Sequence, residues 1–309
     1  MIHFAVLWFL VQVAGRIPAR VLFALAYACG TLAWRLSPRL QRVTRDHMGH
    51  VLGARATPRE VDAAARACVR SAAYYYADFA RYSHLSTEAT LAYLDALEGI
   101  DLVRAAIERG RGVIVVSGHL GAPEMVGQAL APMGLNLAAI TEPLEPPAVH
   151  RLVDGVRQTH GITFFTADLA GLRAARAHLA NGGVLAVLAD RDVLGTGSPY
   201  VFFGEPAIMP TGVVELARRT GAEVLGARVL RGARPWRYHA YVEPIPLPAP
   251  TGDRQADLDS GMRAALAWLE GAIASAPGQW FALQPIWSGL AGDRRPGTRA
   301  ALPGDEHAG

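Results

Sequence analysis

From residue 99 onward, short apolar runs alternate with helical segments, and this alternation limits the possible folds more than any other feature of the sequence. The runs "VIVVS" (113–117) and "VLAVLA" (184–189) are continuously apolar, with no polar residue at every second position. Such runs are typical of strands that are covered on both faces. We therefore predict an α/β fold with a mainly parallel central sheet flanked by helices.

The same reading gives an order of elements along the chain. Helices are expected at 99–109, 123–133, 146–160 and 169–181, and strands at 113–117, 135–140, 162–166 and 184–189. After a stretch rich in glycine and proline (191–212), we expect a helix at 212–220, strands at 223–231 and 236–243, and a last helix at 254–275.

A long helix is predicted before the sheet, at 58–82. Thr57 can cap its first turn, and Glu60 stands in the capping-box position. The helix ends in an aromatic cluster that we expect to serve packing rather than ligand binding, namely Tyr74, Tyr75, Tyr76, Phe79 and Tyr82.

The N-terminal region is both apolar and basic. Residues 4–15 and 21–34 are nearly uncharged, yet residues 1–50 hold six arginines against one acid, Asp46. Neither apolar run reaches the roughly 18 to 20 residues that a membrane span needs. A cleaved signal peptide and buried core helices are the alternatives, but the first run lacks a basic leader and a clear cleavage site. We expect helices that lie in the interface of an anionic membrane.

The chain is thus divided into three parts: an interfacial helical segment (1–50), an α/β domain (51–287) and a tail (288–309). The tail has too few apolar residues to pack and is predicted to be disordered. Cys29 and Cys68 lie in apolar helical surroundings without a CxxC pattern, and we expect reduced, structural thiols. The histidines form no HxH or HExxH pattern, so no metal site is expected.

The candidate chemistry lies in "SGHLGAPE", directly after the strand predicted at 113–117. Sites in open α/β sheets collect at the carboxyl ends of strands. His119 and Glu124 would point to different faces of a regular helix, but Gly118 and Gly121 allow a loop that folds the two side chains toward one another. The alternative is that Glu124 only complements the dipole of the following helix and that His119 is a polar strand end.

A histidine with a carboxylate partner can act as a general base. The sequence lacks GxSxG, and Ser117 is not placed as a nucleophile elbow. A base without a protein nucleophile indicates that the nucleophile belongs to the substrate.

"HLGAPE" resembles the HxxxxD/E signature of the glycerolipid acyltransferases. Its setting is similar to the branch that contains the lipid A late acyltransferases and the phosphatidylinositol mannoside acyltransferases. The resemblance extends over "TEPLEPP" (141–147), "LADRDVLGTG" (188–197), "VFFGEPAIMPTG" (201–212) and "QWFALQPIW" (279–287). The last two motifs are closer to the mannoside enzymes, because lipid A enzymes more often carry a basic, aromatic motif in place of "QPIW".

The resemblance implies roles for individual residues. His119 is the base that deprotonates an acceptor hydroxyl, and Glu124 is the acid of the motif. A second carboxylate that orients the histidine matches Asp190, which we prefer to Asp192 because Asp190 follows the strand predicted at 184–189.

Three further residues are candidates for substrate binding. Glu142 and Arg157 match residues that line the groove of that family, although Arg157 alternatively belongs to a solvated helix face. Glu205 binds acceptor hydroxyls or braces a turn. The backbone of 195–197 is a weak candidate for a phosphate cradle.

The resemblance also implies the reaction and its setting. A fatty acyl group moves from acyl-CoA or acyl carrier protein to a hydroxyl of a membrane (glyco)lipid, at the cytoplasmic face of the membrane, and no cofactor or nucleic acid takes part. The acceptor is expected to be of the phosphatidylinositol mannoside type, with lipid A as the alternative. A thioesterase or esterase on the same fold and a non-catalytic lipid-binding protein remain as other functions.

Overall fold

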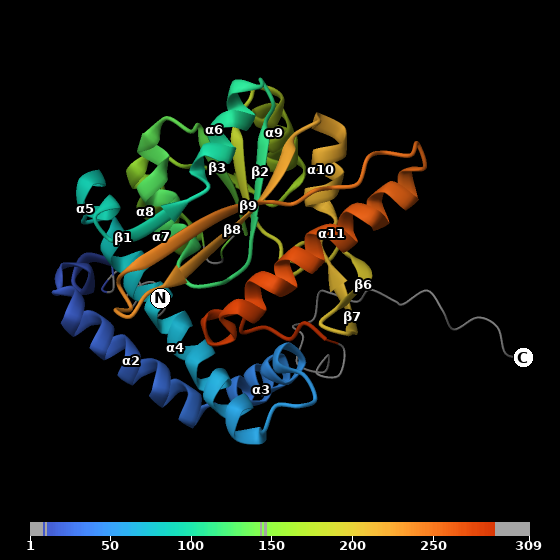
Figure 1. Ribbon diagram of the computed structural model, residues 1–309. Helices are drawn as coiled ribbons and strands as arrows, with labels where there is room; N and C mark the ends of the chain where they lie inside the picture. The colour runs from blue at the N-terminus through green and yellow to red at the C-terminus, as the bar shows by residue number, and fades with distance from the viewer. Residues whose placement is uncertain (1–8, 10, 143, 145–146, 288–309) are drawn as a thin grey trace, which may run out of the picture.

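The computed structural model describes residue 9 and residues 11–142, 144 and 147–287. Its centre is a seven-stranded sheet with the order β1-β9-β8-β2-β5-β3-β4 (Figure 1). The strands are β1 (Leu94–Glu98), β2 (Val113–Ser117), β3 (Leu137–Thr141), β4 (Thr163–Thr166), β5 (Val184–Leu188), β8 (Glu223–Arg231) and β9 (Tyr238–Pro244). Every neighbouring pair is parallel except β8 and β9, so the predicted α/β fold is confirmed.

The helices follow the predicted order closely. They are η1 (Ala14–Arg16), α2 (Ala19–Leu36), α3 (Pro38–Leu52), α4 (Pro58–Tyr82), α5 (Thr87–Leu91), α6 (Ile100–Glu108), α7 (Pro123–Leu130), η2 (Ala131–Met133), α8 (Pro147–Arg157), η3 (Gln158–His160), α9 (Leu169–Ala180), α10 (Gly212–Thr220), α11 (Arg254–Ser275) and η4 (Pro277–Gln279). The capping box at the start of α4 is present, with Thr57 and Glu60 each accepting from the other's backbone. The predicted tail lies outside the described residues.

Three strands and the short helix α5 were not predicted. β1 precedes the region in which we expected the sheet, and it pairs with β9, far along the chain. A hairpin, β6 (Ser198–Phe202) and β7 (Glu205–Met209), occupies the stretch rich in glycine and proline. Its two-residue turn places Phe203 and Gly204 at positive φ, the geometry that suits a tight hairpin. The pattern was missed because Phe-Gly is not one of the usual turn pairs.

Residues of β2 point alternately to the two faces of the sheet. Ile114 and Val116 belong to a core cluster with residues of α9 and α10. Val115 and Ser117 face the opposite side and line a cavity bounded by α6, α7 and α8. Because both faces are covered, the strand has no polar position along its first four residues, which explains the continuous apolar run.

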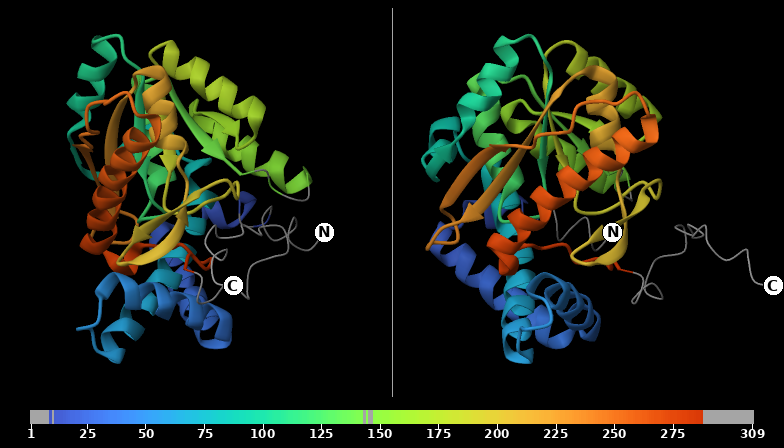
Figure 2. Two further views of the ribbon diagram at one scale, coloured as in Figure 1. Left: turned by 90° about the vertical axis from the view of Figure 1, so that its right-hand side faces the viewer. Right: turned by 45° about the vertical axis from the view of Figure 1, so that its right-hand side comes forward.

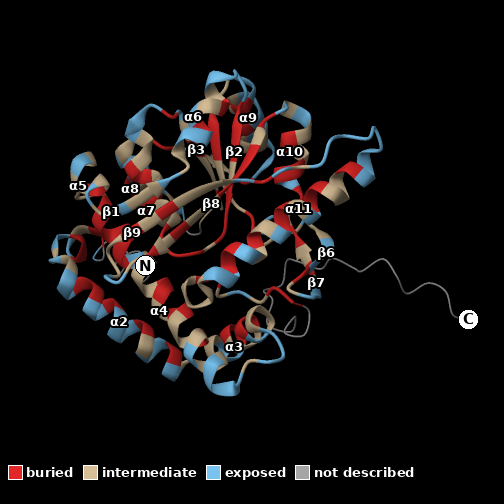
Figure 3. Cartoon of the chain, viewed as in Figure 1, coloured by how far each residue is buried: buried red, intermediate tan, exposed pale blue. Residues whose placement is uncertain are grey.

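The first helices form a layer of their own. In both views of Figure 2, α2, α3 and α4 lie together below the sheet. Leu22, Phe23 and Ala26 of α2 pack against Ala77 of α4. The outer side of α2 is exposed, as the alternating bands along this helix in Figure 3 show.

One expectation about this layer is corrected by the structure. Cys68 is buried, but Cys29 is exposed on α2, so the expectation of a packed, structural thiol is wrong for Cys29. Among the described residues, no single helix has the length and hydropathy of a membrane span, whereas α2 and α3 meet both criteria as a pair bent by 98°.

Candidate active site

His119 and Asp190 form a dyad where two neighbouring parallel strands end. His119 follows β2, Asp190 follows β5, and these strands pair in register up to Ser117 and Leu188. The Nδ1 atom of His119 lies 2.8 Å from Oδ1 of Asp190, and the His119 backbone N–H donates to Oδ2 at 2.9 Å. With Nδ1–H facing the carboxylate, Nε2 carries the lone pair and can accept a proton.

The dyad combines a buried acid with a partly exposed base. The Asp190 side chain is fully buried, whereas 19% of the His119 side chain is accessible. Burial alone would raise the pKa of Asp190, but the charge of His119 and the hydrogen bonds from His119 and Trp280 lower it to about 2. Asp190 is therefore ionised at neutral pH and can stabilise a positive imidazolium.

The loop that carries His119 is held from several directions. The backbone N–H of Phe281 donates to the carbonyl of His119 at 2.7 Å, and the N–H of Gly121 donates to that of Gln279 at 3.0 Å. Gly121 has a φ of +67°, and a Cβ there would lie 1.9 Å from the carbonyl oxygen of Val229. Only glycine fits this position without a backbone shift.

Glu124 does not hold the histidine. Arg157 binds its carboxylate through Nε at 2.9 Å and Nη2 at 3.3 Å, and the hydroxyls of Tyr75 and Tyr82 donate to it at 2.5 and 2.8 Å. The loop places His119 and Glu124 on the wall of the same cavity, but no hydrogen bond joins the two side chains within the described part of the chain. The first turn of α7 instead directs Glu124 toward α4 and α8.

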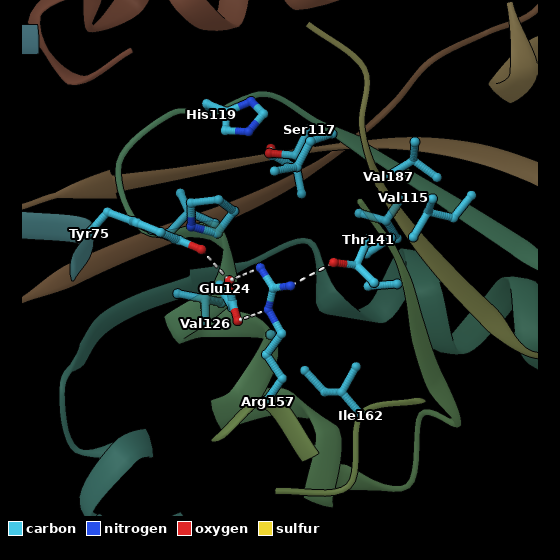
Figure 4. A pocket seen from close by; sticks show the side chains of 18 of the residues that line it. Tyr75, Val115, Ser117, His119, Glu124, Val126, Thr141, Arg157, Ile162 and Val187 are labelled. Atoms are coloured by element: carbon cyan, nitrogen blue, oxygen red, sulfur yellow. Dashed lines mark hydrogen bonds and ion pairs between the residues drawn. The ribbon is translucent and has the colours of Figure 1, made fainter. Parts of the chain in front are cut away.

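The ion pair of Glu124 and Arg157 is buried. The two side chains are 13% and 16% exposed, so the solvated helix face considered for Arg157 is also wrong. Burial alone would raise the pKa of Glu124, but the charge and hydrogen bonds of Arg157 lower it. Arg157 also donates to the hydroxyl of Thr141 at 2.6 Å, which ties α8 to the end of β3 (Figure 4).

A cavity of about 610 Å³ extends from the dyad between the sheet and α6, α7 and α8. Its wall is mostly apolar and includes Val103, Val126, Leu130, Leu137, Val153 and Val229. His119 lies at one end, and Ser117 lies beside it (Figure 4). The Ser117 hydroxyl donates to the carbonyl of Ala227 at 2.8 Å, away from the imidazole. Among the described residues, no hydroxyl or thiol is hydrogen-bonded to His119.

Glu142 lies on the cavity wall beyond β3, as the resemblance implies. Its carboxylate forms an ion pair with Arg191, and Arg191 also donates to the side chain of Gln284. These three residues come from three separate segments, and all three line the cavity. Glu142, Arg191 and Gln284 thus form a chain of polar contacts on a cavity wall that is mostly apolar.

Glu205 and the glycines of 195–197 stay outside this arrangement. Glu205 is exposed at the start of β7 and does not line the cavity, and Gly195 and Gly197 donate backbone N–H groups to Asp192. Asp192 thus stabilises its own loop, whereas Asp190 binds the imidazole of His119. This agrees with the choice of Asp190 over Asp192 in the sequence analysis.

Sequence reasoning missed several side chains of the site. The aromatic cluster of α4 was expected to serve packing, and three of its members, Tyr75, Tyr76 and Phe79, also line the cavity. Trp280 donates its indole N–H to Asp190 at 2.7 Å. The motif that contains Trp280 was noted in the sequence, but nothing local indicates a partner ninety residues away.

Comparison with known proteins agrees with this geometry. The model of the bacterial lipid A biosynthesis acyltransferase family matches residues 1–288. The chain belongs to this family.

Relatives of this acyltransferase family member include phosphatidylinositol mannoside acyltransferases. The protein of that name from Mycobacterium tuberculosis (strain ATCC 25618 / H37Rv) is 30% identical over 195 residues, which cover 61% of this chain and 58% of the relative. The one from Mycolicibacterium smegmatis is 28% identical over 236 residues, 74% of each chain. The chain thus spans less than two thirds of the length of the first relative.

Proposed function

We propose that this protein is an O-acyltransferase that moves a fatty acyl group from a thioester donor to a hydroxyl of a membrane glycolipid. The observation that carries the proposal is the carboxylate-held imidazole at the end of a long apolar cavity. Each methylene that such a cavity removes from water contributes about 0.8 kcal/mol, so an acyl chain is the ligand that gains most from this wall.

The chemical step needs no protein nucleophile. Nε2 of His119 takes the proton of the acceptor hydroxyl while its oxygen attacks the thioester carbonyl carbon. The tetrahedral intermediate then collapses with cleavage of the carbon–sulfur bond, and the thiolate receives the proton from Nε2 of His119. Asp190, ionised beside Nδ1, stabilises the transient imidazolium.

Glu124 and Arg157 support the cavity in this proposal rather than the proton transfer. Their ion pair joins the first turn of α7 to the last turn of α8, the two helices that form one wall. A buried pair of this kind fixes a geometry more than it adds stability.

The acceptor proposed is a lipid of the phosphatidylinositol mannoside type, because the relatives carry that name. A lipid A precursor is the second candidate, which the description of the family supports. The donor is acyl-CoA or acyl carrier protein.

We place the protein at an anionic membrane, on the cytoplasmic side where these donors occur. Val21, Leu25, Leu32 and Leu36 lie along one side of α2 and are between 51% and 72% exposed. The arginines of residues 1–50 supply the complementary positive charge. Tyr76 of α4, which is 55% exposed, also lines the cavity, so the cavity wall reaches the surface of the N-terminal layer at this residue.

Product analysis tests this function. The protein would be mixed with palmitoyl-CoA and vesicles that contain a phosphatidylinositol mannoside, and lipids and free acid would be separated by mass spectrometry. Acylated glycolipid supports the proposal, whereas free palmitate alone identifies a thioesterase. Binding of palmitoyl-CoA without any product identifies a lipid-binding protein.

The base is tested by a matched pair of histidine variants. His119→Ala should lower kcat by about 10²- to 10⁴-fold, the contribution usual for a general base. His178→Ala is the control, since the His178 ring contacts the carbonyls of Asn136 and Val184 and does not itself line the cavity. A folded His119→Ala protein with normal turnover would contradict the mechanism.

A further inference from the structure

Asp190 has three hydrogen-bond donors, and only two of them belong to His119. The third is the indole N–H of Trp280, which donates to Oδ2 at 2.7 Å. Oδ2 also accepts the His119 backbone N–H at 2.9 Å, so Oδ1 remains for the imidazole at 2.8 Å. Oδ1 of Asp190 therefore binds the imidazole, whereas Oδ2 binds the backbone N–H of His119 and the indole of Trp280.

We propose that Trp280 is a positioning residue for the dyad, whose indole N–H fixes the carboxylate plane of Asp190 so that Oδ1 faces Nδ1 of His119. This inference rests on the proposed role of His119 as the base. Rotation of an aspartate carboxylate about its last bond is only weakly restricted by the side chain itself. The orientation in this site must therefore come from the donors around it.

Trp280 is held firmly enough to serve this purpose. Its side chain is fully buried, and its ring stacks on His47 of α3 with 5.1 Å between the ring centroids. Its carbonyl accepts from the thiol of Cys68 on α4 at 2.7 Å. The ring is thus held by α3 and the backbone of the same residue by α4, so the indole N–H has a defined direction.

The same segment also fixes the histidine. The residue before Trp280 accepts the N–H of Gly121 through its carbonyl, and the residue after it donates an N–H to the carbonyl of His119. Residues 279–281 therefore contact both members of the dyad. A displacement of Trp280 would alter the distance between base and carboxylate as well as the orientation of the carboxylate.

Packing alone does not require an indole here. A phenylalanine would retain an aromatic ring against His47, but it would leave Oδ2 of Asp190 with one donor fewer. A hydrogen bond to a charged group is worth more than one between neutral groups, so we expect its loss to change the behaviour of the dyad and not only the stability of the core.

The chain offers a matched control in Trp287. Trp287 belongs to the same core cluster, is 3% exposed, and donates its indole N–H to the carbonyl of Phe202 at 3.0 Å. Trp280→Phe and Trp287→Phe thus remove the same atoms from neighbouring positions, and only the first removes a donor from Asp190.

The two variants would be compared by acyl-transfer kinetics and by thermal unfolding. Trp280→Phe should lower kcat by about tenfold or more, with KM for palmitoyl-CoA changed by less than about twofold. Trp287→Phe should retain kcat within about twofold at a similar loss of thermal stability. Equal effects of the two variants on kcat, or an unchanged kcat in Trp280→Phe, would overturn the inference.

A second readout does not depend on turnover. The Nδ1–H proton of His119, bonded to the carboxylate, should give a downfield proton NMR signal in the native protein and in Trp287→Phe. The signal should shift or vanish in Trp280→Phe, and an unchanged signal would contradict the inference even if the native protein transfers no acyl group. If Trp280→Phe does not fold, the sulfur isostere of tryptophan, benzothienylalanine, at position 280 removes the donor while keeping the shape.

Discussion

At the scale of single residues, the buried His47, whose ring stacks on Trp280, should affect how stability depends on pH. The pKa of His47 is lowered to about 4, mainly by burial; the charge of His50 acts in the same direction, whereas the backbone of Ala282 and the charge of Asp190 oppose it. Between about pH 6.5 and pH 4, the unfolded chain binds a proton at this position that the folded protein excludes. Stability should therefore fall as the pH falls through this window, and the contribution should be complete above about pH 6.5.

The size of this effect follows from the shift. A difference of about 2.5 pKa units corresponds to about 3 kcal/mol of unfolding free energy at most. Urea unfolding at several pH values should show a steeper fall for the native protein than for His47→Phe, which keeps an aromatic ring beside Trp280. The same slope in both proteins would show that His47 does not contribute to the pH dependence of stability.

At the scale of elements, the loop between β2 and α7 depends on one glycine. Gly121→Ala combines a positive φ with a Cβ that would lie 1.9 Å from a backbone oxygen of β8. We expect a loss of about 2 to 4 kcal/mol in unfolding free energy, the sum of backbone strain and overpacking. Activity in the folded fraction should also fall, because the loop carries His119.

The matched control for this loop is Gly182→Ala. Gly182 also has a positive φ, of +77°, but a Cβ there would have no atom within 4 Å. Gly182→Ala should therefore lose only about 1 to 2 kcal/mol of unfolding free energy, from backbone strain, and should keep a normal kcat. Similar losses of stability in both variants would mean that the contact with β8 is relieved at little cost.

At the scale of the whole molecule, the exposed apolar side of α2 should direct the cavity toward the bilayer. Replacing Leu25 and Leu32 by serine removes two side chains that are each more than half exposed, so the fold should not suffer. Sedimentation with anionic vesicles should weaken by about tenfold, given the free energy of burying two leucines in part. Transfer to an acceptor in vesicles should fall with it, and cleavage of a soluble donor should not.

The control for this surface removes exposed apolar side chains elsewhere. Leu169 and Val201 are 75% and 64% exposed, on α9 and β6, and their replacement by serine should leave vesicle binding unchanged. Equal losses in both double variants would argue against α2 as the membrane surface. Resistance of the native protein to both high salt and alkaline extraction would instead indicate a true span.

Short-range sequence patterns were sufficient to predict the fold class, most element boundaries and the location of His119 at a strand end. These features depend on short-range patterns: apolar runs in buried strands, a capping box at Thr57, and the rule that sites follow strand ends, which selected His119 and Asp190. β1 was not predicted because it is only partly buried and pairs with a strand more than 100 residues away.

The pairing of side chains in the site depends on contacts between distant segments and could not be predicted from local patterns. Glu124 is five residues from His119 yet binds Arg157 and two tyrosines, whereas Asp190, 71 residues away, holds the imidazole together with Trp280. The local sequence determines on which helix, strand or loop a side chain lies. Its hydrogen-bond partner depends on which other segments pack beside that element. Buried charged groups require partners, and long-range packing of α4, α8 and the segment after η4 supplies them here.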